Sequence, residues 1–186
     1  MIYRCSQIPG RHAGRHRGYT AVELLFTMAI AGIVTALAVP NFRDFIQNNR
    51  AAEDANALVG ALALARNEAV TRGIPVTVCS STDNETCADD PDWSSGWIVF
   101  TDAVAPVGSV DDAAQPDTVL RALPALRTGS DLAADANFVS YAPTGFLSTA
   151  AGVSFDLDID ECTGNHNRSI TVNVQGRAAV AHTACD

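Results

Sequence analysis

Glu23 has the most unusual chemical setting in this chain, because it is a carboxylate inside an apolar run. Across residues 19–39 it is the only charged residue. An acid within a membrane-spanning helix costs enough free energy to indicate a function by default, although a position near the interface lowers that cost. The chemistry open to such a carboxylate is the pairing of a cation that would otherwise be buried alone.

Four acids close to one another, Asp156, Asp158, Asp160 and Glu161, form the one cluster that could bind a metal. Asp-x-Asp-x-Asp opens a calcium-binding loop. The rest of that loop fails here, since Glu161 stands where the sharp turn needs glycine and Asn167 where a bidentate glutamate belongs. A solvated strand face explains alternate acids more simply, so we predict no metal and no other cofactor.

The histidines give little support for catalysis. His12 and His16 precede Gly18, and His166 and His182 have no acid or nucleophile at a spacing typical of a catalytic pair. We therefore predict that the protein is not an enzyme and that these histidines lie at the surface.

The element that must position Glu23 is a membrane-spanning helix. As a helix, the 21 residues 19–39 reach about 31 Å, which matches the hydrocarbon thickness of a bilayer. Every basic residue is arginine, and four arginines precede Gly18 with no acid among them, at Arg4, Arg11, Arg15 and Arg17. The positive-inside rule places that end in the cytoplasm and the rest of the chain outside it.

Two simpler interpretations of the apolar run are weaker. Ala36-Leu37-Ala38 fits the cleavage site of a secretory signal. The apolar region of such a signal is about 7 to 15 residues, shorter than this run. An inert anchor would need no glutamate.

The helical pattern continues beyond the apolar run. Pro40 can kink a helix without ending it. Apolar residues then recur at helical spacing up to Ala69, and Gly73 with Pro75 gives a stop signal after Arg72. We predict one helix over residues 20–72, with residues 19–39 as its transmembrane half and residues 40–72 as an amphipathic half that packs on a domain.

Residues 73–186 change to the pattern of a β-rich domain. Short runs of β-branched and aromatic residues alternate with turn residues. These runs are residues 76–78, 97–100, 119–120, 138–141, 153–157 and 170–174. We predict an α+β fold with a long N-terminal helix on a C-terminal antiparallel β-sheet head, and exposed loops at residues 103–115 and 128–136.

The cysteines indicate an oxidising compartment. Apart from Cys5, the four cysteines lie in the head, an even number that suits two disulfides. Cys79 and Cys87 bracket a short polar loop. Cys162 and Cys185 flank two runs that would bring them together if paired as a hairpin. We predict Cys79–Cys87 and Cys162–Cys185 bonds, and the alternative is four buried free thiols.

At its start the chain resembles the type IV prepilins. The resemblance rests on Gly18, Tyr19, Thr20, Glu23 with Leu24-Leu25 after it, and Pro40. It implies that residues 1–18 are a leader, that a prepilin peptidase cuts between Gly18 and Tyr19 and methylates the Tyr19 amine, and that N-terminal helices pack as a filament core. The chain departs from the family at Tyr19, where phenylalanine is usual, and at Ala21-Val22, where the residues are usually bulkier.

This resemblance gives the Glu23 carboxylate a partner. Cleavage would create an α-amine with a reference pKa of about 7.7 to 8.0 at the edge of an apolar environment. Glu23 could pair with its own amine or with that of a neighbouring subunit, and in the second case it would fix the axial register of the packed helices.

The head resembles the GspH/FimT family of minor pilins and pseudopilins. The resemblance rests on ARNEAVTRGIPVTVCSS from Ala65, on Trp93, on GWIVFTD from Gly96, and on late cysteines around GRAAV. It implies a subunit of a type II secretion pseudopilus or a type IV pilus that acts in filament assembly or at the tip. Its partners would be other pilins, the peptidase and the bacterial inner membrane, with the head in the periplasm.

Two other functions compete with this hypothesis. Some members of the family capture DNA with arginines near a C-terminal Gly-Arg motif, and here Gly176-Arg177 retains one such arginine. From residue 19 onward eight arginines face 21 acids, a net charge of −13, which disfavours nucleic acid. The alternative from another class is a membrane-anchored periplasmic binding module.

Overall fold

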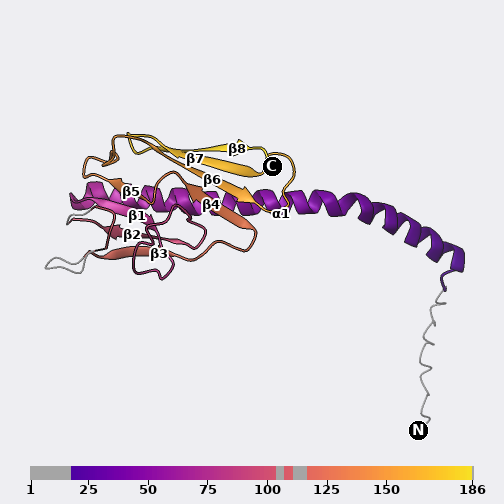
Figure 1. Cartoon of the computed structure of the whole chain (residues 1–186). Helices are drawn as coiled ribbons and strands as arrows, with labels where there is room; N and C mark the ends of the chain where they lie inside the picture. Colours follow the sequence, from indigo (N-terminus) through magenta and orange to yellow (C-terminus); the bar gives the residue numbers. More distant parts are fainter. Residues whose placement is uncertain (1–17, 104–106, 111–116, 186) are drawn as a thin grey trace, which may run out of the picture. The chain divides into compact units, whose positions relative to one another are not determined.

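The computed structural model describes residues 18–103, 107–110 and 117–185 (Figure 1). The expectations for Cys5, His12, His16 and most of the leader lie outside the described residues, as does much of the loop at 103–115. The chain divides into two units, Met1–Pro40 and Asn41–Asp186, and each is described by itself. Helix α1, Ala21–Arg72, contributes residues to both units.

Local signals set both ends of α1. The Thr20 hydroxyl accepts a hydrogen bond from the Glu23 N–H at 3.2 Å, which is the bond an N-cap makes. At the other end Gly73 adopts φ of 70° and donates its N–H to the Ala69 carbonyl at 3.0 Å, as a C-terminal glycine does. The helix is continuous through Pro40, so this proline does not end it, and the kink there stays a prediction.

In the unit of residues 41–186, one stripe of α1 forms the centre of the core. Its buried members are mostly alanine, which favours helix and lets strands approach the helix backbone closely. They are Ala51, Ala55, Leu58, Ala61, Leu62, Ala65 and Ala69.

Two four-stranded antiparallel sheets pack against this stripe. The first sheet has the order β3-β2-β1-β5 and the second has the order β4-β6-β7-β8 (Figure 1). The strands of the first sheet are β1 Val76–Ser80, β2 Trp97–Thr101, β3 Val119–Leu123 and β5 Phe138–Tyr141. The strands of the second sheet are β4 Ser130–Ala134, β6 Val153–Ile159, β7 Asn167–Val172 and β8 Ala178–Thr183.

A single hydrophobic cluster joins the helix to both sheets. Within this cluster the rings of Trp93 and Phe155 make a T-shaped contact, with 4.9 Å between the ring centroids and 88° between the planes. The indole N–H of Trp93 donates to the Ala136 carbonyl at 3.1 Å, so the buried ring keeps its polar atom satisfied.

The predicted α+β fold, a long helix on an antiparallel β head, is confirmed, with two differences. Residues 128–136 are not a loop, because Ser130–Ala134 is strand β4 and pairs with β6. In this strand Ser130 and Leu132 are buried while Asp131 and Ala133 are exposed, an alternation that the small and polar residue types hide in the sequence. The head also has two sheets rather than one, since β4 leaves the first sheet and β5 returns to it.

Both disulfides join the cysteines that the sequence pairs. Cys79 and Cys87 have Cα atoms 5.6 Å apart, and Cys162 and Cys185 have Cα atoms 5.7 Å apart. The first bond ties the polar loop to a small second cluster of Cys79, Ile98 and Phe100 on the other face of β1 and β2. The second closes the open end of the β7–β8 hairpin, in which Asn167 pairs with Thr183.

We expect both bonds to stabilise the head, and the second more than the first. Their closed loops of nine and 24 residues give about 2.6 and 3.4 kcal/mol in the chain-entropy model, as upper estimates. Urea unfolding of the full chain should therefore show a larger loss for Cys162→Ser with Cys185→Ser than for Cys79→Ser with Cys87→Ser. Non-reducing peptide mapping checks the pairing, and a peptide linking Cys79 to Cys162 or Cys185, or four alkylatable thiols in the folded protein, would contradict it.

Candidate functional site

The start of α1 presents the predicted processing and assembly residues together. Gly18, Tyr19 and Thr20 precede the helix and are exposed, and Tyr19 is 80% exposed. Glu23 lies in the first helical turn, three residues after the capping Thr20. Threonine and glutamate at this spacing form a capping-box sequence, in which the N3 carboxylate can serve the Ncap N–H. Glu23 therefore has a local helix-capping role open to it beside the pairing with an amine.

The rest of this first unit exposes apolar side chains all round the helix. Large side chains that globular proteins usually bury are more than half exposed here, and none in the described part from Gly18 to Ala38 is buried. They are Val22, Leu24, Leu25, Phe26, Met28, Ile30, Ile33, Val34 and Leu37. By length and composition this part of α1 can cross a membrane, with a mean hydropathy of 2.2 over its 18-residue window. A surface of this kind needs lipid or other apolar helices around it.

Polar contacts attach the second half of α1 to the head. The Gln47 amide donates to the Glu161 carbonyl at 2.9 Å, and Thr163 donates its hydroxyl to Asp44 at 2.8 Å. The Arg168 guanidinium donates to Asn48 at 2.6 Å and to the His166 carbonyl at 2.6 Å. These contacts hold the turn after β6 and the start of β7 against the helix. The helix residues that make them precede the apolar stripe in the sequence.

Arg168 and Asp54 are charged residues that the fold buries. Burial lowers the pKa of Arg168 because desolvation disfavours the cation. Burial also raises the pKa of Asp54, an effect that the Ser130 hydroxyl partly offsets and the Glu53 carboxylate reinforces. Asp54 lies beside the first residues of the stripe and close to Ser130 of β4, so the fold buries an acid that the sequence pattern places on the polar side of the helix.

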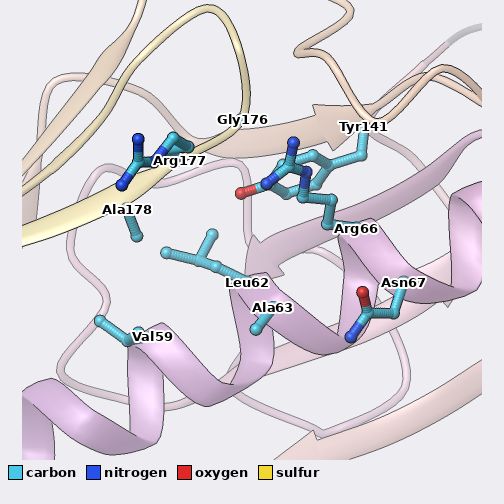
Figure 2. Close-up of a pocket in the computed structure, with 9 residues that line it drawn as sticks. All are labelled: Val59, Leu62, Ala63, Arg66, Asn67, Tyr141, Gly176, Arg177 and Ala178. Carbon is cyan, nitrogen blue, oxygen red and sulfur yellow. The ribbon is translucent and has the colours of Figure 1, made fainter.

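Arg66 of α1 holds together two loops of the head, one at Gly145 and one at Gln175. Its Nε–H donates to the Gly145 carbonyl at 2.9 Å, and its Nη2 donates to the Gln175 carbonyl at 3.1 Å. Tyr141 lies beside it, as Figure 2 shows, and burial raises the pKa of that phenol to about 12 against the opposing charge of Arg66. The two loops thus meet over one arginine of the helix.

A pocket of about 270 Å³ opens beside this clamp (Figure 2). Its floor is the apolar side of α1, and its far wall is the start of β8. The residues that line it are Val59, Leu62, Ala63, Arg66, Asn67, Tyr141, Gly176, Arg177 and Ala178.

In the Gly176-Arg177 motif, the glycine is needed for the structure of the head. Gly176 has φ of 75°, and a Cβ atom there would lie 2.4 Å from the Gly145 carbonyl oxygen. The glycine is therefore required by the close approach of the two clamped loops. Arg177 is exposed, and within the described residues its guanidinium has no hydrogen-bond or ion-pair partner.

The candidate metal and catalytic residues do not converge. Asp156 and Asp158 lie on the exposed face of strand β6, which is not a metal-binding loop conformation, and Glu161 sits in a turn at φ of 54°. Among the described residues no three His, Cys, Asp or Glu side chains form a group that could hold a metal ion. His182 lies with its Nδ1 3.2 Å from the Asn165 carbonyl oxygen.

The Thr20 cap, the Arg66 clamp and the buried Asp54 are the features that sequence reasoning missed. The cap had a visible signal in Thr20-x-x-Glu23. The other two had none, because their partners lie 79 and 109 residues away for Arg66, and in strand β4 for Asp54.

We expect Gly176→Ala to destabilise the head more than Gly164→Ala does. Both glycines have positive φ, of 75° and 78°, so both changes cost roughly 1 kcal/mol of backbone strain. Only Gly176 has backbone in the way, whereas nothing lies within 4 Å of a Cβ at Gly164. Overpacking should add about 1 to 3 kcal/mol. Equal free energies of unfolding in urea for the two variants would contradict the close approach of the loops.

One protein family matches the larger part of this chain. Residues 54–176 match the family described as Type II transport protein GspH. A type IV major fimbrial protein FimA of Dichelobacter nodosus is 28% identical over 105 residues, which are 54% of this chain and 56% of that protein. The chain thus matches only about half the length of this curated relative.

One solved structure shares the fold, and a second is more distantly similar. The type IV minor pilin FimU of Pseudomonas aeruginosa superposes with a TM-score of 0.55 at 21% identity, over 74% of this chain and 92% of that one. The minor pseudopilin EpsH of Vibrio cholerae matches over 72% of this chain and 97% of its own, at 15% identity and a TM-score of 0.45. Because the family match covers more than half of its residues, this chain belongs to the GspH family of pilin-like proteins.

Proposed function

We propose that this protein is a minor pilin or pseudopilin, anchored by one helix in the bacterial inner membrane, that works by being inserted into a filament. The observation that carries the proposal lies in the first unit, where an all-round apolar helix begins at Ala21, just after Gly18 and Tyr19, and has the isolated Glu23 in its first turn. Membership of the GspH family supports the role of a filament subunit. The role is structural rather than enzymatic, and it needs no cofactor.

Processing would come first. The Gly18–Tyr19 bond lies outside α1 and is exposed, which suits a peptidase that must hold its substrate in an extended form. A cut there would remove the leader of residues 1–18 and make Tyr19 the N-terminus, the amine of which would then be methylated. The head, with its disulfides, would stand in the oxidising periplasm.

Assembly would follow from the same surface. The exposed apolar side chains between Val22 and Leu37 would contact lipid before assembly and would pack against other pilin helices in the filament. Glu23 would pair with the amine of a neighbouring Tyr19 and set the register, because a charge in an apolar environment is tolerated only next to a partner.

Two alternatives remain outside this proposal. A minor pilin for DNA uptake would use Arg177, which is exposed, but the acidic head opposes a polyanion. A membrane-anchored binding module would need neither Glu23 nor the cleavage site.

The role of Glu23 can be tested by Glu23→Gln in a strain that lacks the wild-type gene. Glutamine keeps the size of the side chain and also serves at the N3 position of a capping box, so helix capping should survive. Only the charge is lost. We expect membrane insertion and leader removal to continue. Recruitment of the variant into sheared filaments should fall by at least about tenfold, because a hydrogen-bonded charged pair contributes roughly 1.5 to 3 kcal/mol.

The matched control is Glu85→Gln, which removes an exposed acid of the head. It should assemble normally. If the Glu23→Gln subunit enters filaments as the wild type does, the glutamate acts as a helix cap and the proposed pairing is wrong.

A further inference from the structure

We propose that the pocket between α1 and the start of strand β8, which together with the free edge of β8 is called the groove below, is a docking site for an extended segment of another filament subunit. An acidic side chain of that segment enters the pocket between Arg66 and Arg177. The inference rests on the proposed function for the identity of the partner, but the site itself is argued from the head alone. Every residue of the groove belongs to the unit of residues 41–186.

The inner face of the second sheet is left uncovered at β8. Val180 lies opposite Ile170 in the β7–β8 ladder, so the two side chains share that face. Ile170 is completely buried, whereas Val180 is 44% exposed. Of the residues on this face of β8, Ala178 still packs against the core, whereas Val180 presents an apolar side chain that is largely uncovered.

β8 is also a free edge. In the described residues it pairs with β7 on one side only, and its positions from Ala179 to Thr183 are all exposed. Its six residues, AAVAHT, contain no lysine, proline or acid of the kind that blocks edge pairing. An extended peptide could add its backbone to this edge and place alternate side chains over the groove.

The pocket at the start of β8 supplies the charge that selects the peptide. Figure 2 shows Arg66 and Arg177 on opposite sides of it, with Leu62 between them. None of the residues that line it, all within the described part of the chain, is an acid. Arg66 uses two of its five N–H donors on the clamped loops, and Arg177 uses none of its side-chain donors within the described residues.

The chemistry favours a protein carboxylate over a nucleic acid. The chain carries a net charge of −9, so a polyanion that extends beyond the pocket meets a repulsive surface. A single carboxylate in the pocket meets only the two arginines. The apolar floor at Val59 and Leu62 suits apolar side chains that flank the acid in the bound segment. A pocket of about 270 Å³ holds a side chain rather than a duplex.

The test uses the full chain in detergent micelles and two fluorescein-labelled heptapeptides of alternating valine and threonine. One peptide has a central glutamate and its twin has glutamine. We expect fluorescence anisotropy to show at least about tenfold tighter binding of the glutamate peptide, since hydrogen bonds to charged groups are the strong ones. Empty micelles correct for partitioning of the peptides.

Arginine variants localise the effect. Arg177→Gln should remove the preference for glutamate, while Arg121→Gln, which removes an exposed arginine of β3, should leave it unchanged. Equal binding of the twins, no binding of either peptide at millimolar concentration, or an equal loss in both variants would overturn the proposal. Binding of a labelled twelve-nucleotide oligothymidine that Arg177→Gln abolishes would also overturn it, in favour of nucleic acid.

This assay needs no filament. If the peptides do not bind as expected, the docking site is wrong and the result with Glu23→Gln is unaffected. If Glu23→Gln assembles normally, the proposed pairing is wrong and the peptide-binding result is unaffected.

Discussion

The packed stripe of α1 between Ala51 and Ala69 is the contact on which the rest of the head depends. Five of its seven buried members are alanine, and these small side chains let strands of both sheets close on one helix. Without that stripe each sheet would expose one apolar face, which sheets of four strands cannot leave in water. The helix is thus the shared core of the two sheets.

The same helix meets a different constraint in residues 21–38. There no side of it is polar, and none of the other described residues of that unit covers it. One continuous element therefore carries a surface made for an aqueous domain and a surface made for lipid or other helices. A charged residue is acceptable in the second surface only at its edge, and Glu23 lies at that edge, in the first turn after the Thr20 cap.

The sequence predicted those features that depend on local pattern. The helix was expected from residue 20 and begins at Ala21, and its end after Arg72 follows from Gly73. The runs around Val78, Val99 and Phe155 are strands as expected, because alternation of β-branched and aromatic residues is a local signal.

Features that depend on distant partners were out of reach. Strand β4, SDLAA, has one large apolar residue, and only its pairing with β6 makes it a strand. The division into two sheets follows from where β5 returns to pair with β1. No local pattern marks Arg66, because its role depends on the carbonyl groups of Gly145 and Gln175, which lie in distant loops.

The central claim, that this chain is processed as a pilin, is tested most directly by the mass of its N-terminal peptide. The protein is purified from membranes of its native organism, digested, and analysed by mass spectrometry. The account predicts a chain that begins at Tyr19, with one methyl group on its amine. An intact Met1, or a chain that begins at Val39 as a cleaved secretory signal would leave it, would contradict the account.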